Sequence, residues 1–397
     1  MDCPPTYLRA RVSSHSDVLC LSHLRWNWVY QRPQHLLTRA AKQRRVFFFE
    51  EPVYQNGCAQ NGCAQDGGAA RLAIAQPHPN VWVATPHLPA GLVNGSRDAL
   101  LRDLLNGLIE SAGLEDYLSW YYTPMALPFS RHLQPVARIY DCMDQLSAFA
   151  GAPPELIDLE RELLDSSDLV FTGGLSLYEA KRELHDDVHC FPSGVDVEHF
   201  AAARAGLRQP DDQQAVPGPR LGYCGVIDER LDLPLLASLA QARPRWQVVL
   251  VGPVTKVDEA ALPRAANIHY LGPKRYEDLP AYIGGWDVAL MPFARNESTR
   301  YISPTKTPEY LAAGKPVVST SIRDVVRTYG EPGLVRIADE PEAFVAAVEE
   351  SLLDDPLLRL RRVDAVLRQR SWDKTWSRMQ CLIDGVTVAP GLTAEAA

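Results

Sequence analysis

The chain has 397 residues, of which 46% are hydrophobic, and it carries a formal net charge of −9. This length exceeds what one hydrophobic core usually serves and predicts two domains. The negative charge argues against nucleic acid as a partner, and no run of residues is long and apolar enough to predict a membrane span. The first residues lack the apolar centre of a secretory signal, so we expect a cytoplasmic protein.

Short β-rich runs alternate with helical patterns along the chain, which predicts parallel sheets covered by helices. The polar segment 205–219 predicts a linker, after which the alternation restarts. We therefore expect an α/β fold with two Rossmann-like doubly wound domains, 1–204 and 220–370, facing across a cleft. The predicted strands are residues 17–22, 45–50, 80–85, 137–141, 168–173 and 187–196, and then 220–225, 246–252, 267–272, 286–293, 316–320 and 334–337.

The cysteines and histidines do not predict a metal centre. Cys58 and Cys63 lie in a tandem duplication, NGCAQNGCAQ, at residues 56–65, whose spacing fits no usual zinc pattern and instead predicts an exposed loop. The histidines, His23 among them, have no spacing typical of a metal site or a catalytic triad. We expect no metal and no cofactor.

Residues 24–45 contain six lysines and arginines and no acid, interleaved with aromatic side chains. One interpretation is a surface for a phosphate-linked lipid or for the anionic inner face of a membrane, with peripheral binding there. The other is an amphipathic helix with a solvated basic face and tryptophans in the core. The sequence leaves both open.

Residues 303–320, SPTKTPEYLAAGKPVVST, predict a loop, a short helix and a strand. Either Ser303 or Thr307 is expected to cap the helix. Free amides at a helix start and the charge of Lys306 suit a phosphate, and the carboxylate of Glu309 suits the hydroxyls of a ribose. The segment therefore predicts a nucleotide site, to which we assign Ser303, Pro304, Thr305, Lys306 and Glu309.

Three glycines, Gly225, Gly252 and Gly272, end predicted strands of the second domain. Ligands of parallel sheets bind at this edge, and glycine lets the backbone approach them closely. Arg230 follows the first of these strands. It is either a cation for a diphosphate or a loop residue paired with Asp228 or Asp232.

Three segments resemble the retaining family 4 (group 1) of the GT-B glycosyltransferases. They are PSGVDVEHF at 192–200, NIHYLGPKRYEDLPAYIGGWDVALMPF at 267–293, and the segment at 303–320. The resemblance covers roughly residues 16–385. The stretches WNWVYQRPQHLL at 26–37 and IYDCMD at 139–144 are similar to a subgroup associated with bacterial cell-surface polysaccharides.

The resemblance implies an N-terminal acceptor domain, a C-terminal nucleotide-sugar domain, and a last helix, within 371–397, that crosses back to the first domain. Glu309 matches the second acid of the family's E-x7-E motif, which binds the ribose. The first acid is replaced by Tyr301, for which Glu297 or Asn296, in the preceding loop, is the expected substitute. Val226 stands where the family commonly has an arginine, which leaves Lys306 and Arg230 to neutralise the leaving diphosphate.

On the acceptor side, Asp141 and Asp144 end a strand that is expected to face the cleft, and we expect them to orient acceptor hydroxyls. Asp141 is alternatively a satisfied cap. Arg32 and Trp28, from the basic segment, are assigned to the same side.

The sequence thus predicts a hexosyltransferase that uses a nucleoside-diphosphate sugar, UDP-linked by analogy, and a glycan or lipid-linked glycan acceptor. The resemblance implies retention of anomeric configuration, with the leaving diphosphate taking the acceptor proton. Two alternatives stay open: a sugar-nucleotide epimerase of the same fold, and a non-catalytic subunit that scaffolds a polysaccharide assembly complex.

Overall fold

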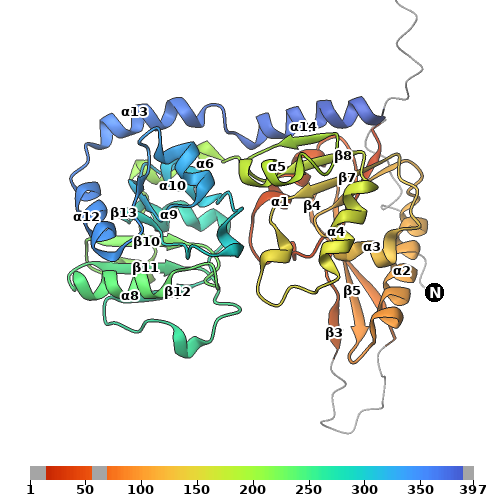
Figure 1. Cartoon of the computed structure of the whole chain (residues 1–397), viewed down its shortest axis with the longest axis horizontal. Coiled ribbons are helices and arrows are strands. Elements are labelled where there is room, and N and C mark those ends of the chain that lie inside the picture. The colour runs from red at the N-terminus through yellow and green to blue at the C-terminus, as the bar shows by residue number, and fades with distance from the viewer. Residues whose placement is uncertain (1–14, 56–68, 388–397) are drawn as a thin grey trace, which may run out of the picture.

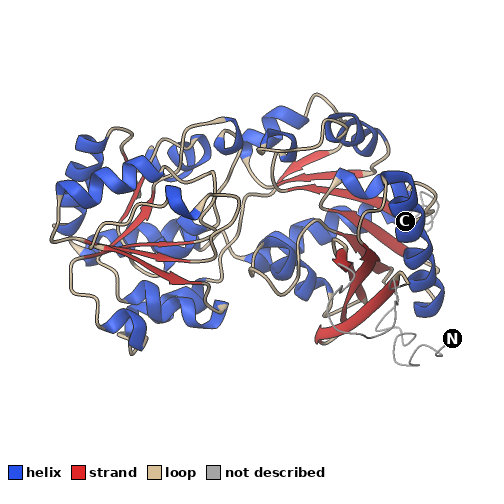
Figure 2. Cartoon of the chain, turned by 90° about the horizontal axis from the view of Figure 1, so that it is seen from below, coloured by secondary structure: helices blue, strands red, loops and turns tan. Residues whose placement is uncertain are grey.

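The computed structural model describes residues 15–55 and 69–387. The NGCAQ duplication, with Cys58 and Cys63, lies outside the described residues. The chain forms two lobes, each built around its own sheet with helices on both faces (Figures 1 and 2).

The first sheet has nine strands in the order β3-β5-β2-β1-β6-β7-β8-β9, with β4 antiparallel to β5 and every other pair parallel. All five residues of β1 are buried, because helices cover both faces of the sheet. The strands are β1 (Asp17–Leu21), β2 (Val46–Phe49), β3 (Val53–Gln55), β4 (Arg71–His78), β5 (Val81–Pro89), β6 (Tyr117–Tyr121), β7 (Ala137–Cys142), β8 (Leu169–Thr172) and β9 (Val188–Cys190). The helices are α1 (Arg32–Ala40), α2 (Asn94–Ala112), α3 (Leu127–Ser130), α4 (Leu156–Asp165) and α5 (Leu175–Lys181).

The second sheet is parallel and has the order β12-β11-β10-β13-β14-β15, which reverses direction next to β10. This is the doubly wound order, and it confirms the predicted fold class. The strands are β10 (Arg220–Cys224), β11 (Gln247–Val251), β12 (Ile268–Gly272), β13 (Val288–Met291), β14 (Val317–Ser319) and β15 (Arg336–Ile337). The helices are α6 (Val197–Ala201), α7 (Asp211–Gln214), α8 (Leu233–Ala242), α9 (Leu279–Gly284), α10 (Lys306–Ala312), α11 (Arg323–Val325), α12 (Pro341–Leu352), α13 (Pro356–Leu367) and α14 (Trp372–Thr387).

The segment 205–219, predicted as a linker, is packed against the second domain. Gln213, in α7, is fully buried, accepts a hydrogen bond from Trp286 Nε1 at 2.9 Å and donates to the carbonyl of Tyr282 at 2.9 Å. Val195 and Phe200, which precede this segment, also lie in the second hydrophobic core. Residues before 205 therefore already contribute to the core of the second domain. The exact domain boundaries stay a prediction.

Helices α13 and α14 run along one edge of the molecule, α13 over the second lobe and α14 over the first (Figure 1). Four side chains of α14 are buried in a core cluster of the first domain, and His35 of α1 stacks on one of them, Trp372, with ring centroids 4.7 Å apart. The four are Trp372, Trp376, Met379 and Ile383.

Most cations of the basic segment 24–45 contact other side chains of the protein. Five of its six cations have protein partners: Arg25 contacts Glu50, Arg32 contacts Asp141, Arg39 contacts Asp373, Arg44 contacts Gln380, and Arg45 contacts Asp17. Trp26 is buried against Phe48. Membrane contact through this segment stays a prediction, since Lys42 and Trp28 are exposed while most of the other cations are engaged by the protein. In the parts of the chain that the structure describes, no helix combines the length and apolar character needed to cross a bilayer.

Aromatic side chains join the two domains on one side of the cleft. Tyr276 of the second domain stacks on Tyr30 of the first, with ring centroids 4.5 Å apart, and on His199 at 4.3 Å. Tyr301, which replaces the first acid of the family motif, packs against a hydrophobic cluster of the first domain. Residue 301 of this chain therefore contributes to the packing between the two domains.

Candidate active site between the domains

A cavity of about 130 Å³ lies between the domains at the carboxyl edge of the second sheet. The segment Ser303–Lys306 and Gly225 form its second-domain wall, together with Arg230. Five of the residues predicted to contact the donor or its diphosphate therefore share one cavity with Arg230: Gly225, Ser303, Pro304, Thr305 and Lys306.

Lys306 begins α10, and the residue before it, Thr305, occupies the cap position without a side-chain hydrogen bond. The expectation that Ser303 or Thr307 caps the helix is wrong, because the helix starts between them. Lys306 Nζ donates to Glu309 Oε2 at 2.9 Å, and both side chains are largely buried. Burial raises the pKa of Glu309, which Lys306 opposes. Burial also acts to lower the pKa of Lys306, but the charge of Glu309 raises it overall.

The three glycines at the strand ends have different roles. Gly225 lines the small cavity. Gly252 has a φ of +146°, and a Cβ there would lie 1.8 Å from the carbonyl oxygen of Gly225. Gly272 has a φ of +69° and accepts a hydrogen bond from the Gly252 amide at 2.9 Å. Gly252 and Gly272 are not among the residues that line this cavity, so their contact with the nucleotide stays a prediction. The lack of a side chain at Gly252 lets the loop of Gly225 pack closely against it.

Arg230 is held by Asp228, one of the two partners expected from the sequence. Its Nε lies 3.0 Å from Asp228 Oδ1 and its Nη2 2.6 Å from Oδ2. The guanidinium carbon also lies 5.7 Å from the ring centroid of Phe149 in the first domain. These contacts fix the cation at the entrance to the small cavity, in a position pre-organised for a negative charge.

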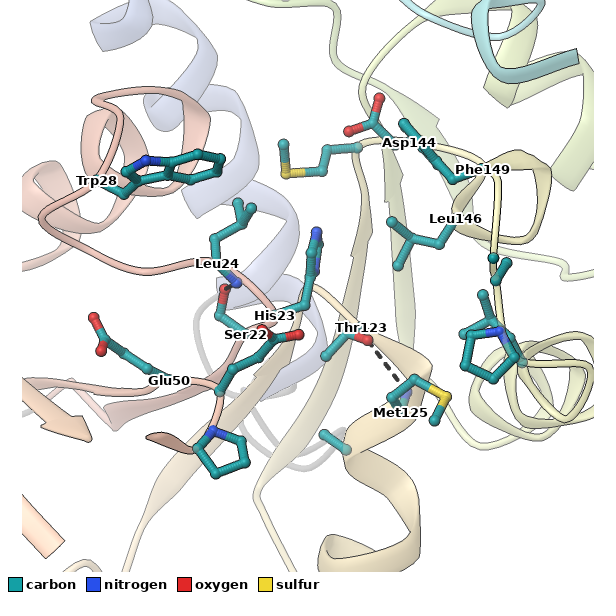
Figure 3. A pocket seen from close by; sticks show the side chains of 18 of the residues that line it. Ser22, His23, Leu24, Trp28, Glu50, Thr123, Met125, Asp144, Leu146 and Phe149 are labelled. Carbon is teal, nitrogen blue, oxygen red and sulfur yellow. Dashed lines mark hydrogen bonds between the residues drawn. The ribbon is translucent and has the colours of Figure 1, made fainter. Parts of the chain in front are cut away.

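A larger cavity of about 640 Å³ adjoins the small one and is lined mainly by the first domain. Trp28, which is 49% exposed, and Phe149 lie on opposite sides of it, and His23 points into it between them (Figure 3). The predicted acceptor residues Trp28 and Asp144 both line this cavity.

The two cavities share several lining residues. A reaction between a ligand in one cavity and a ligand in the other would therefore take place beside these shared residues. Among these, Asp144 is the group without a fixed partner: no described residue donates a hydrogen bond to its carboxylate. Burial raises its pKa to about 6, an effect that the cation of Arg230 opposes and the charge of Asp228 increases. The shared residues are Gln31, Met143, Asp144, Val226 and Arg230.

The structure corrects two of the acceptor-side assignments. Asp141 is fully buried, and Arg32 Nη2 lies 2.8 Å from its Oδ1 and Arg32 Nε 3.0 Å from both oxygens. Arg32 also donates to the carbonyl of Phe191 at 2.8 Å. Asp141 lines neither cavity, and the Arg32 guanidinium, at the wall of the small one, is already engaged. Both residues therefore support the site from behind and do not contact an acceptor.

Glu297 does not substitute for the missing first acid. Its side chain is 73% exposed, it lies 3.5 Å from Arg300, and it lines neither cavity. The short 3₁₀ helix Glu297–Thr299 is capped by Asn296, which turns the glutamate toward solvent. The catalytic assignment of Glu297 is therefore wrong.

Three residues of the larger cavity were not assigned from the sequence. His23 lies two residues after the end of β1, and Phe149 lies in the loop before α4. Lys256 follows β11, and its Nζ lies 5.7 Å from the ring centroid of Phe149. Only His23 had a usable signal, since it lies just beyond the carboxyl end of the central strand β1, at the edge where ligands bind.

Replacing Asp144 by asparagine should stabilise the protein at neutral pH. Because its pKa is raised from 3.8 to about 6, the folded protein loses stability as the pH rises through this range and the carboxylate ionises. At pH 7.5 we expect the variant to be about 1–3 kcal/mol more stable than the wild type, with no difference below about pH 4. Urea unfolding at both pH values measures this, with the exposed Asp158→Asn as control; equal stability at pH 7.5 would contradict the assigned environment.

Comparison with solved structures identifies the fold of the chain. Sucrose-phosphate synthase from Thermosynechococcus elongatus superposes with a TM-score of 0.68 at 16% identity, over 94% of this chain and 99% of that one. A structure described as "Trehalose-6-phosphate from E. coli bound with UDP-2-fluoro glucose" gives a TM-score of 0.67 at 16% identity, with the same coverage. The fold is therefore that of the GT-B glycosyltransferases.

The sequence comparisons concern the second domain most directly. Residues 218–354 match the family described as Glycosyl transferases group 1. The chain is also 28% identical over 305 residues to the putative teichuronic acid biosynthesis glycosyltransferase TuaH of Bacillus subtilis (strain 168), which covers 70% of this chain and 75% of that protein. Residues 218–354 are thus similar to the group 1 glycosyltransferases, and 70% of the chain is similar to the Bacillus subtilis protein.

Proposed function

We propose that the protein transfers a hexosyl unit from a UDP-linked sugar, with retention, to a hydroxyl of a glycan or lipid-linked glycan during synthesis of a cell-surface polysaccharide, on the cytoplasmic side. The observation that carries this proposal is the pair of adjoining cavities, one beside Lys306 and Gly225 and the other in the first domain. A transferase needs such an arrangement because donor and acceptor must meet at one point.

The small cavity is the proposed site of the donor diphosphate. Of the cations at its wall, Lys306 and Arg230 are proposed to face the diphosphate. Glu309, which is hydrogen-bonded to Lys306, is the proposed partner of the ribose hydroxyls. Breaking the bond between C1 of the sugar and the diphosphate places negative charge on the leaving oxygen, which fixed cations stabilise. No metal is part of the proposed mechanism.

The acceptor hydroxyl is proposed to approach beside Asp144, which lines both cavities. The new bond forms between the acceptor oxygen and C1 while the bond to the diphosphate breaks on the same face. The acceptor proton passes to the departing diphosphate, so no protein nucleophile takes part. Asp144 orients the hydroxyl by accepting its hydrogen bond.

The choice of UDP and of a polysaccharide acceptor rests on similar proteins. One similar structure is described as bound with UDP-2-fluoro glucose. Another is an alpha,alpha-trehalose-phosphate synthase (UDP-forming) from Burkholderia xenovorans in complex with glucose-6-phosphate; its TM-score is 0.66 at 14% identity, over 93% of this chain and 99% of that one. The similar Bacillus subtilis protein is named for teichuronic acid biosynthesis.

One observation favours the non-catalytic alternative. All three cations that line the small cavity are already paired with carboxylates: Lys306 with Glu309, Arg230 with Asp228, and Arg32 with Asp141. A nucleotide-binding scaffold subunit would retain such a site without transferring sugar. An epimerase would instead release an altered nucleotide sugar with no acceptor present, which product analysis detects.

Nucleotide binding is the first test. A thermal shift with UDP, GDP, ADP and CMP should show stabilisation by one diphosphate, about 2.7 kcal/mol at 100 times its dissociation constant. Glu309→Gln should remove most of the shift, and the exposed Glu297→Gln should retain it. If no nucleotide stabilises the wild type at millimolar concentration, the proposed donor site is wrong; stabilisation without transfer to a broad set of acceptors would favour the scaffold subunit.

A further inference from the structure

The polar side chains on the wall of the larger cavity are mostly engaged by the protein itself. Glu50 accepts hydrogen bonds from the amide of Trp26 at 2.7 Å, from Thr85 Oγ1 at 2.9 Å and from Arg25 at 3.3 Å. Thr123 Oγ1 accepts from the amide of Met125 at 3.2 Å, as the dashed line in Figure 3 shows. An occupant rich in hydroxyls would find few free partners in this part of the cavity.

A group of apolar side chains from several elements of the first domain forms another part of the wall. In Figure 3, Asp144 lies near the top of the view and Met125 lies lower down, with Leu146 at a height between them, so the apolar side chains extend away from Asp144. A hydrocarbon or aromatic group placed there would be removed from water at little polar cost. The side chains that form this wall are Phe49, Leu101, Met125, Phe129, Leu146 and Leu156.

His23 is the exception within this apolar region. Its imidazole points into the cavity, and its Nδ1 is buried without a hydrogen-bond partner among the described residues. The Ser22 hydroxyl accepts from the amide of Leu24 at 3.0 Å, which forms the turn that directs His23 inward. Burial lowers the pKa of His23 to about 4, opposed by a hydrogen bond to the backbone of Tyr122 and increased by Lys256. The ring is therefore neutral at pH 7, and its Nδ1 is the atom that we consider for a hydrogen bond to a ligand.

We propose that the acceptor is a sugar joined to an apolar aglycone: the sugar lies beside Asp144 and Arg230, the aglycone fills the larger cavity as far as Met125, and His23 forms a hydrogen bond at the boundary between the two. This inference rests on the proposed function and narrows its acceptor, since a free glycan lacks the apolar part. The aglycone is recognised as hydrocarbon, whether its source is an aliphatic chain or an aromatic ring.

The test measures acceptor binding without any donor. Methyl, n-octyl and phenyl glycosides of glucose, galactose and mannose, kept below micelle-forming concentrations, are titrated into the protein, and binding is measured by isothermal titration calorimetry. We expect the octyl or phenyl glycoside of at least one sugar to bind ten times or more tightly than its methyl glycoside. A preference for octyl indicates an aliphatic source, and a preference for phenyl an aromatic one.

Four variants test whether the preference arises in the cavity. Met125→Gln should reduce the ratio of octyl to methyl affinity at least threefold, whereas Leu184→Gln, at an apolar residue that is 56% exposed outside the cavity, should leave it unchanged. His23→Leu should weaken every glycoside about tenfold without changing the ratio. His23→Asn, which keeps a polar group there, should recover part of that loss.

Equal binding of methyl and longer glycosides would overturn the proposal, as would no binding of any of them. An octyl preference that survives Met125→Gln would also overturn it, because the chain would then bind elsewhere. Since no donor is used, these outcomes are distinct from the failure of nucleotide stabilisation that would overturn the proposed function.

Discussion

Replacing Lys306 by methionine should lower the rate of sugar transfer about 10²- to 10³-fold. The affinity for the uncharged part of the donor should change less. Lys306 is the cation that begins α10 at the wall of the small cavity, where negative charge develops on the leaving diphosphate. Removing one pre-organised group of this kind costs about this much in other enzymes. Release of the nucleoside diphosphate, followed with the donor that the thermal shifts identify, measures the effect.

The same substitution leaves Glu309 buried without its partner, so loss of stability must be separated from loss of catalysis. The double variant Lys306→Met/Glu309→Gln removes both charges and should recover stability without recovering transfer. Lys42→Met, at an exposed lysine, is the matched control and should change neither. Transfer at the wild-type rate by a folded Lys306→Met variant would show that the proposed leaving-group site is wrong.

Replacing Asp141 by alanine should destabilise the protein by about 3–5 kcal/mol. The reason is that Arg32, which is only 2% exposed, would keep a buried charge with no carboxylate beside it. The midpoint of urea unfolding, compared with that of the wild type, measures this loss.

The matched control for Asp141 is Asp158→Ala. Asp158 forms a 3.6 Å ion pair with Arg161 in which both side chains are largely exposed, and such pairs contribute less than about 1 kcal/mol. If Asp141→Ala were as stable as this control but bound acceptor glycosides poorly, the original assignment of Asp141 to the acceptor would be restored.

Most of the sheet could be predicted because strands of a doubly wound domain are buried on both faces and therefore read as continuous apolar runs. The central strand β6 was not predicted. Its sequence, YLSWY, has a serine in the middle and three aromatic residues, and it follows a helix after only a short turn at Gly113. The antiparallel strand β4 was also missed, since its residues are largely exposed and carry no burial pattern.

The candidate site was predictable where chemistry follows directly from position along a strand or helix. Lys306 and Gly225 lie at the carboxyl edge of the second sheet, and both line the small cavity. The roles of Asp141 and Arg32 were not predictable, because their ion pair joins residues 109 positions apart, and only packing shows that it is buried. Glu297 was misassigned for a related reason: a family motif gives a position in the chain, but not the direction in which a side chain points.

The crossing of α14 also bears on the order in which the molecule is completed during synthesis. Trp372, Trp376, Met379 and Ile383 belong to a core cluster of the first domain, yet they are translated after the whole second sheet. The domain that leaves the ribosome first therefore lacks part of its interior until translation is nearly complete. During that interval the apolar surface that later receives α14 is uncovered, and folding of the first domain becomes dependent on folding of the second.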